Sequence, residues 1–436
     1  MMALMCSMAM MIPMSFSSDV MFLMQFMHVI LFIYLLILNY NMFISMVSYN
    51  FGLDSFSYGL ILLSLLISPF MIISMNSCFS GSLFLLNNLF LSLSVLIIFG
   101  SLNFLFMYMS FEFVLLPLVI LILGWGYQPE RLMAGMYMFF YTVIVSLPLL
   151  LLIIYIYLNM GSLFFDYLKI DSFFFLEYFI LVIVFMVKLP MYMLHFWLPK
   201  AHVQAPVSGS MVLAGLMLKI GGYGLIRISY IFEYMFFTYS YFWFSVSLVG
   251  SVLISIICLV QCDIKCLIAY SSVSHMGVVI MGLMTMKSWG IIGSFLLMLS
   301  HGLCSSGLFY MANLFYCRTN SRSFFINSGL MMYMPSCSMI WFLFCIFNMS
   351  CPPSINFLSE FMILTSMMFF WEKSFVYFLF MSFFCACFSY YLYSFSQHGM
   401  YHNFYSFAPL VVMEFLALFL HLFPLVFAVL LVWMFI

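Results

Sequence analysis

The chain has 436 residues, of which 67% are hydrophobic and 5% are charged, and its formal net charge is −1. Soluble domains carry about 25% charged residues, so this composition excludes a soluble globular protein. The balanced charge excludes a basic protein that binds nucleic acid and a polybasic protein of the membrane surface. Helices that are apolar on every side are solvated by lipid, so the composition predicts an all-α polytopic membrane protein.

Fourteen stretches of the chain are apolar over about the 20 residues that a membrane-spanning helix needs. In chain order, the predicted spans cover residues 1–16, 21–46, 57–76, 82–100, 103–123, 132–158, 174–197, 207–229, 239–261, 264–285, 289–316, 330–369, 374–396 and 406–434. The first stretch has neither a basic start nor an evident cleavage site. We therefore interpret it as a spanning helix and not as a targeting peptide.

Two of these spans contain prolines close to an ionisable residue. The seventh has Pro190, Pro199 and Pro206 around or after Lys188, and the twelfth has Pro352 and Pro353 before Glu360. A proline removes a backbone hydrogen bond, and irregular backbone at membrane depth persists only inside protein or beside water. We therefore predict that both helices are broken near mid-membrane.

The two broken spans are five helices apart, which favours two inverted five-helix repeats related by an axis in the membrane plane. Lysine and arginine counts in the loops, five against four, place the odd-to-even loops inside and both termini outside. The expected organisation is an N-terminal group of helices over 1–100, whose fourth helix also opens the first repeat, a first repeat over 82–229, a second repeat over 239–396 and a C-terminal helix over 397–436.

Four charged residues lie well inside apolar stretches: Glu112, Lys188, Lys219 and Glu360. A charge at the centre of a membrane helix costs roughly 2.5–3.5 kcal/mol, and buried ionisable side chains build proton relays in pumps. The alternative is a static ion pair between helices, which contributes little net stability. We favour the relay. We also predict that Glu112 and Lys188 face each other, because either charge alone in a low-dielectric site would be costly.

Histidines are further candidates for the relay, since histidine titrates nearest to neutral pH. We expect His301 between or beside Lys219 and Glu360 on one hydrated path, and keep His195, His202 and His275 as additional candidates. The alternative for each is a hydrogen bond that joins two helices. On the last predicted helix, Glu414 and His421 could share a face, and we favour packing or a partner contact there.

Cofactor ligands are not evident in the sequence. Cys258, Cys262 and Cys266 are spaced four apart, but a metal site would need supporting ligands of definite geometry. Buried cysteine usually serves as a small apolar residue. The histidines do not form two matched pairs on two helices, as a haem site between helices would need. We therefore predict that this chain binds no metal, haem, flavin or nucleotide.

The stretch KLPMYMLHFWLPKAHVQAPVSGS, residues 188–210, resembles the signature of the proton-translocating subunits of respiratory complex I. The stretches at 124–131 and 213–227 narrow the resemblance to the chain 4 family of mitochondrial NADH–ubiquinone oxidoreductase. Further matches lie at 263–276, 300–306 and 352–360. Two departures are Gln204, where the family often has glutamate, and Met413, where a basic residue is common.

The resemblance implies an antiporter-like fold of fourteen helices with two inverted repeats. It assigns the proton relay to the four buried charges, with a polar axis through His301. It further implies a multi-pass protein of the mitochondrial inner membrane that translocates protons while other subunits oxidise NADH and reduce ubiquinone. Expected partners are other membrane-arm subunits, including neighbouring antiporter-like subunits, and membrane lipids; a stand-alone homo-oligomer is not expected. The alternatives are a subunit of a related cation/proton antiporter and a structural spacer with inert buried pairs.

Overall fold

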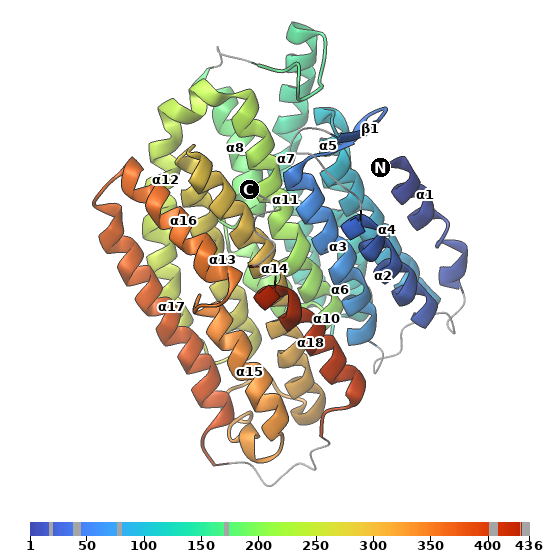
Figure 1. Ribbon diagram of the computed structural model, residues 1–436, viewed down its shortest axis with the longest axis vertical. Coiled ribbons are helices and arrows are strands. Elements are labelled where there is room, and N and C mark those ends of the chain that lie inside the picture. The colour runs from blue at the N-terminus through green and yellow to red at the C-terminus, as the bar shows by residue number, and fades with distance from the viewer. Residues whose placement is uncertain are drawn as a thin grey trace. The chain divides into compact units, whose positions relative to one another are not determined.

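The computed structural model describes residues 1–16, 21–37, 45–75, 81–169, 174–400, 409–427 and 429. This part of the chain is almost entirely helical, as the composition predicts (Figure 1). The chain divides into two compact units. Unit 1 comprises Met1–Leu189 and Gln204–Tyr239, and unit 2 comprises Pro190–Val203 and Ser240–Met434.

Unit 1 contains helices and one small hairpin. Its elements are α1 (Met2–Ala9), η1 (Pro13–Phe16), α2 (Met21–Ile37), β1 (Ser45–Ser48), β2 (Phe51–Leu53), α3 (Ser55–Ser74), α4 (Ser82–Gly100), α5 (Phe104–Phe113), α6 (Leu115–Trp125), α7 (Arg131–Met160), α8 (Phe175–Lys188), α10 (Val207–Val212), the π-helical turn η3 (Leu213–Met217) and α11 (Leu218–Ile231). The antiparallel pairing of β1 with β2 was not predicted. It begins at Ser45, inside the predicted span 21–46, whereas α2 ends at Ile37.

Unit 2 is built around one long helix, α14, which packs against α13, α15, α16 and α18. The elements that lie wholly or mostly in this unit are α9 (Trp197–Gln204), α12 (Glu233–Cys258), α13 (Ile264–Met284), α14 (Ser288–Thr319), η4 (Leu330–Met332), α15 (Pro335–Asn348), α16 (Ile355–Phe370), α17 (Ser374–Gln397) and α18 (Val412–Phe427).

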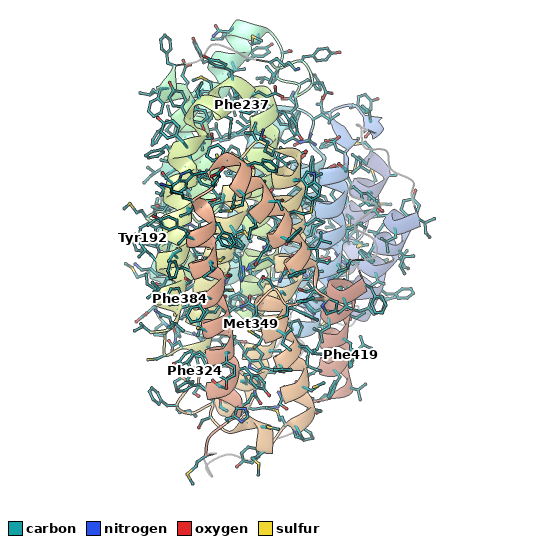
Figure 2. All side chains as sticks on the ribbon, turned by 60° about the vertical axis from the view of Figure 1, so that its left-hand side comes forward. Tyr192, Phe237, Phe324, Met349, Phe384 and Phe419 are labelled. Carbon is teal, nitrogen blue, oxygen red and sulfur yellow. The ribbon has the colours of Figure 1, made fainter. Side chains whose placement is uncertain are left out.

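A helix occurs in each of the predicted spans. Within the described ranges, nine helices are long and apolar enough to cross a membrane, and further apolar helices are shorter. The predicted span 103–123 is divided at Val114 into α5 and α6. Large apolar side chains are exposed in both units, among them Phe237 at 61% and Phe419 at 59%, both labelled in Figure 2. Such exposure is what lipid-facing helices require.

Both predicted helix breaks are present. Helix α8 ends at Lys188, and the next helix, α9, begins at Trp197. Helix α15 ends at Asn348, and α16 begins at Ile355. Non-glycine residues with positive φ occur in both interruptions, at Met193 (+73°) and Ser350 (+60°), which confirms that the helical path is abandoned there. The inverted repeat, its two-fold axis and the repeat boundaries remain predictions.

Glycines allow close helix contacts next to the ionisable residues. A Cβ atom added at Gly221 of α11 would lie 2.7 Å from the backbone nitrogen of Leu189, directly after Lys188. A Cβ atom at Gly293 of α14 would lie 2.9 Å from Cβ of Met362 on α16. These distances are too short for a real side chain, so α11 meets the end of α8, and α14 meets α16, at positions that only glycine accommodates.

Candidate functional site

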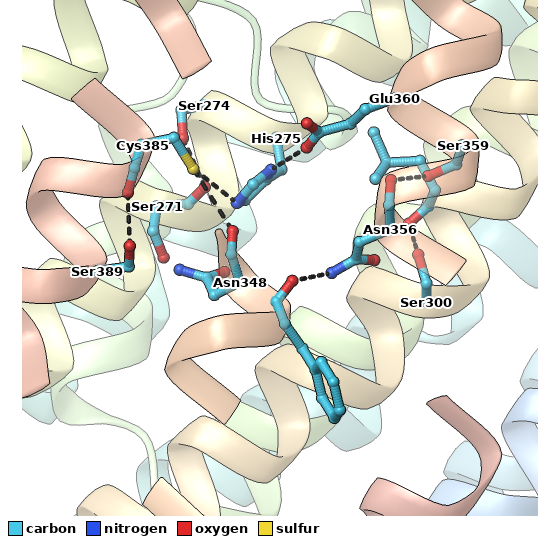
Figure 3. A network of polar contacts seen from close by, with 12 residues as sticks. Ser271, Ser274, His275, Ser300, Asn348, Asn356, Ser359, Glu360, Cys385 and Ser389 are labelled. Atoms are coloured by element: carbon cyan, nitrogen blue, oxygen red, sulfur yellow. Dashed lines mark hydrogen bonds and ion pairs between the residues drawn. The ribbon is translucent and has the colours of Figure 1, made fainter. Parts of the chain in front are cut away.

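The helix break in unit 2 brings Glu360 next to a histidine of another helix. Glu360 lies in the N-terminal half of α16, and its side chain is 11% exposed. Its Oε1 atom lies 3.5 Å from Nδ1 of His275 on α13 (Figure 3). This is an ion-pair distance, slightly longer than a hydrogen bond. A small movement of either side chain would therefore allow a proton to pass between the two groups.

His275 is the centre of a buried cluster. Its Nε2 atom lies 3.7 Å from Sγ of Cys385 on α17, and the same sulfur lies 3.5 Å from the carbonyl oxygen of Asn348, the last residue of α15. The ring of His301 on α14 is 5.5 Å from the ring of His275, measured between centroids. Figure 3 shows His275 between Cys385 and Glu360. His301 and Glu360 of the predicted relay and the additional candidate His275 thus lie together; we call these three residues the proton-relay cluster after that prediction, and they connect α14, α13 and α16.

Buried amides line the interruption between α15 and α16. Nδ2 of Asn356 donates to the carbonyl oxygen of Phe347 at 2.7 Å. Oδ1 of Asn356, Nδ2 of Asn348 and Oε1 of Glu360 are buried and have no hydrogen-bond partner among the described residues. Buried polar atoms are normally satisfied by protein or by ordered water. The interruption therefore provides hydrogen-bonding positions suited to water beside Glu360.

In unit 1, Lys188 is buried at the last position of α8, with 2% exposure. Its Nζ atom donates to the carbonyl oxygen of Phe111 at 3.4 Å and lies 3.7 Å from the centroid of the Phe111 ring. The last carbonyls of a helix lack intrahelical partners, and Phe111 is in the last turn of α5. A carbonyl oxygen and a π face both stabilise an ammonium group.

Glu112 and Lys188, which are predicted to face each other, interact electrostatically but do not form an ion pair in this structure. The ion pairs among the described residues join Arg227 to Asp54, His275 to Glu360 and Arg318 to Glu414. Glu112 is adjacent to Phe111 and near enough to act on Lys188 electrostatically, but its Oε1 atom is buried with no hydrogen-bond partner in the described structure. Lys188 binds Phe111 instead, because α5 ends there and leaves that carbonyl available.

Lys219 is fully buried at the start of α11 and donates from Nζ to the carbonyl oxygen of Ala214. Ala214 belongs to the π-helical turn η3, which precedes α11. A π turn alters the regular pattern of backbone hydrogen bonds and is frequent at functional sites. Lys219 and Glu360 lie in different units, so the predicted hydrated path that joins them remains a prediction.

Two charges outside the four that the sequence selected, Arg227 and Lys265, are also largely buried. Arg227, on α11, forms an ion pair with Asp54, and its Nε atom donates to the Tyr223 hydroxyl at 2.9 Å. That hydroxyl donates to the carbonyl oxygen of Phe99 at 2.9 Å. Lys265, at the start of α13, is 1% exposed. The charge of each lies near a predicted span end, where a solvated anchor is the usual expectation.

Comparisons with known proteins agree with this architecture. Residues 101–389 match the family described as NADH:quinone oxidoreductase/Mrp antiporter, transmembrane, and residues 1–100 match the amino terminus of NADH-ubiquinone oxidoreductase chain 4. The chain 4 protein of Ceratitis capitata is 46% identical over 90% of this chain and 89% of its own length. That of Aedes aegypti is 44% identical over 90% and 89%. The chain belongs to the NADH-ubiquinone oxidoreductase chain 4 family.

Solved structures show the same fold at low sequence identity. A chain of respiratory complex I from Thermus thermophilus superposes with a TM-score of 0.86 at 19% identity, over 97% of this chain and 94% of that one. A chain of an archaeal membrane-bound sulfane sulfur reductase also gives 0.86, at 18% identity, over 97% and 74%. The chain 4 family comprises antiporter-like, proton-translocating membrane subunits, and the shared fold is consistent with that membership.

The remaining histidine candidates of this chain 4 member lie outside the proton-relay cluster. His195 lies in the interruption between α8 and α9, and its ring stacks on Phe196 with centroids 4.7 Å apart. His202 on α9 stacks on Phe309, also at 4.7 Å and nearly parallel. On α18, Glu414 pairs with Arg318 at 2.7 Å, and Nδ1 of His421 lies 2.7 Å from the carbonyl oxygen of Ala417. These contacts within the chain fit packing, one of the two roles favoured for these residues, and the other, a partner contact, stays a prediction.

The structure also shows where the three spaced cysteines lie and what Gln204, which differs from the family's usual glutamate, contacts. Cys258 ends α12, Cys262 lies in the connection and Cys266 is on α13, so the three do not form one helix face. No group of three potential metal ligands occurs in the ranges that the structure describes. Gln204 donates from Nε2 to Glu130 at 3.1 Å. A glutamate there would place a second carboxylate beside the first.

Sequence reasoning missed Asn348, Asn356 and Cys385. Asn348 directly precedes the interruption and Asn356 is one helical turn before Glu360, so their positions in the sequence carried a signal. Cys385 resembles the other apolar cysteines of the chain, and only the packing of α17 against α13 and α16 identifies it.

Proposed function

We propose that the proton-relay cluster of His301, His275 and Glu360 carries protons in unit 2, and that Glu112, Lys188 and Lys219 do so in unit 1. The observation that carries this proposal is the buried 3.5 Å approach of His275 Nδ1 to Glu360 Oε1. Ionisable groups inside a membrane protein are costly unless paired, and paired groups of this kind form the relays of pumps. His195 and His202 remain secondary candidates.

The donors and acceptors around His275 suggest how a proton is held. When the Cys385 thiol donates to the carbonyl of Asn348, its sulfur can accept only from N–H at Nε2 of His275. A neutral ring then has an acceptor at Nδ1, facing a carboxyl oxygen that is also an acceptor when ionised. Two acceptors that face each other repel. One additional proton between Nδ1 and Oε1 turns this repulsion into a hydrogen bond. The pair is therefore suited to take up and release a single proton.

In unit 1 the same chemistry is proposed for Lys188. The Phe111 carbonyl and ring stabilise its ammonium group without neutralising it. Approach of the Glu112 carboxylate would hold the lysine proton, whereas protonation or withdrawal of Glu112 would favour its release. Lys188 and Glu112 then act as a switch rather than as a static link between helices.

The setting of this activity is also part of the proposal. Relatives named NADH-ubiquinone oxidoreductase chain 4 come from animals, which supports the mitochondrial inner membrane as the location. We assign NADH oxidation and ubiquinone reduction to other subunits, with no cofactor on this chain. Its partners would be other membrane-arm subunits of complex I, among them neighbouring antiporter-like subunits, together with membrane lipids.

The test is the His275→Gln variant in the intact complex, reconstituted into sealed vesicles. Glutamine retains hydrogen-bonding capacity but cannot be protonated near neutral pH, so we expect normal assembly and proton translocation reduced at least about tenfold. His421→Gln is the matched control, because His421 is equally buried in unit 2 but contacts a backbone carbonyl and the Tyr310 ring. Normal translocation by an assembled His275→Gln complex would contradict the proposal.

A further inference from the structure

Unit 2 contains a cavity that the proton-relay cluster does not use. It has a volume of about 420 Å³ and is formed where α14 begins and α16 ends. Its lining residues are Lys287, Ser288, Trp289, Thr365, Ser366 and Phe369. The volume falls in the range of sites that hold small organic ligands.

The floor of the cavity is formed by closely packed helices. A Cβ atom added at Gly290 would lie 2.9 Å from the hydroxyl oxygen of Ser366 and 2.6 Å from the carbonyl oxygen of Gly282. The first turn of α14 therefore rests directly on α16 and on α13. Ser366 itself is 1% exposed, and its hydroxyl donates to the carbonyl oxygen of Ile363. This close packing limits movement of the helices that carry the lining residues Ser288 and Ser366.

The electrostatic character of the cavity is positive. Lys287 is exposed and has no carboxylate at ion-pair distance among the described residues. It immediately precedes α14, a helix of 32 residues whose first turn contains no acidic side chain. The hydroxyl groups of Thr365 and Ser366 already donate to backbone carbonyls of α16. Lys287 is the cationic side chain of the lining, so it attracts a bound anion, and the helix dipole adds to this attraction.

The aromatic residues around the cavity are those of a membrane boundary. Trp289 is 56% exposed and Phe369 is 83% exposed, and Trp371, just after α16, is 43% exposed. Tryptophan is enriched where lipid headgroups meet acyl chains, since its ring is largely apolar and its N–H is polar. The cavity is therefore lined by one cationic side chain and by large aromatic side chains. A soluble anion would use only Lys287, whereas an anionic phospholipid matches both.

We infer that this cavity binds an anionic phospholipid, with its phosphate at Lys287 and its upper acyl chains against Trp289 and Phe369. The occupied site would join the start of α14 to the end of α16, the helices that carry His301 and Glu360. The inference rests on a membrane location of unit 2 and not on the proton-relay roles, so each can fail without the other.

The test uses the intact complex in detergent and a photoactivatable phosphatidylglycerol, with labelled peptides identified by mass spectrometry. We expect labelling of the peptides that contain Lys287–Trp289 and Thr365–Phe369. Lys287→Gln should reduce it about fivefold, which is the contribution of one lysine near an anionic lipid. Lys287→Arg should retain it. Lys373→Gln is the matched control, since Lys373 is an exposed lysine just beyond α16 that does not line the cavity.

Two further measurements separate the sources of the phosphate group. A photoactivatable phosphatidylcholine should label these peptides weakly, and millimolar inorganic phosphate should not displace phosphatidylglycerol. Equal labelling of the Lys287→Gln and Lys373→Gln complexes would overturn the inference, as would equal labelling by the two lipids. Full displacement by inorganic phosphate would show that the site binds a free anion instead.

Discussion

Nδ1 of His275 and Oε1 of Glu360 lie 3.5 Å apart on helices that are separated in the sequence by the whole of α14 and α15. The break between α15 and α16 allows this close approach, because a new helix, α16, begins at Ile355 and places Glu360 inside unit 2. A histidine and a carboxylate in this position can share one proton, which neither could hold alone at low cost in an apolar interior.

The first prediction concerns Glu112. Because no closed ion pair joins it to Lys188, Glu112→Gln should change the stability of the assembled complex by less than about 1 kcal/mol. It should nevertheless impair proton translocation, since Lys188 loses the group that controls its proton. Native gel analysis of assembly and proton uptake by vesicles would be compared in the same preparation. Normal assembly with normal uptake would refute the switch.

The second prediction concerns the buried pair of Arg227 and Asp54, whose side chains are 12% and 9% exposed. Arg227→Gln leaves the Asp54 carboxylate without its cation and should lower stability by about 3–5 kcal/mol. The double variant Asp54→Asn, Arg227→Gln removes both charges and should recover most of the loss. Thermal inactivation of the assembled complex measures the loss of stability in the single variant and its recovery in the double variant. If the double variant is no more stable than the single one, the pair is not the source of the effect.

The third prediction is a pH dependence at Asp166, in the connection after α7. Partial burial raises the pKa of this carboxyl, the nearby Asp54 raises it further, and Arg227 opposes both. A raised pKa in the folded state means that the neutral carboxyl is favoured. Its stabilising contribution is complete below the ordinary pKa of aspartate and is lost as pH rises through the raised value.

Asp166→Asn should therefore flatten the pH dependence of local stability above about pH 4, the ordinary pKa of aspartate. Hydrogen exchange of the peptide that contains residues 161–168, measured from pH 4 to pH 7, reports this directly. The wild-type peptide should become less protected as pH rises, after correction for intrinsic exchange, and the variant should not. An identical pH profile in both proteins would show that Asp166 does not contribute.

Much of the fold follows from local physics that a sequence displays. Long apolar runs identified the helices, and the prolines near Lys188 and Glu360 identified the two breaks, because a proline removes a helical hydrogen bond. A proline alone does not end a helix here, since Pro69 lies inside α3 and Pro148 inside α7. The hairpin at Ser45–Leu53 was missed because strands of three and four residues are too short to give a clear pattern, and Ser45 and Met46 extend the apolar span before them. Burial of Lys265 was missed because position near a span end does not reveal which helices cover it.

The candidate site was harder to predict than the helices. Glu360 and His301 could be selected individually, because a charged or titratable group in an apolar run is unusual. The central position of His275 could not be selected, since it depends on which faces of α13, α14 and α16 meet. The hydrogen bond from Lys188 to the Phe111 carbonyl could not be predicted either, because no charge pattern reveals the available carbonyl at the end of α5.

The measurement that tests the relay most directly compares Glu360→Gln with Glu372→Gln in the reconstituted complex. Glu360 is buried on α16, and Glu372 is an exposed glutamate just beyond the same helix. Both variants should assemble, and protons translocated per NADH oxidised, together with the rate of oxidation, would be recorded for each. We predict that Glu360→Gln reduces proton translocation at least about tenfold, as expected for loss of a proton-transfer group, while Glu372→Gln leaves it unchanged. Equal translocation by the two assembled variants would contradict the assignment of Glu360 to the proton relay.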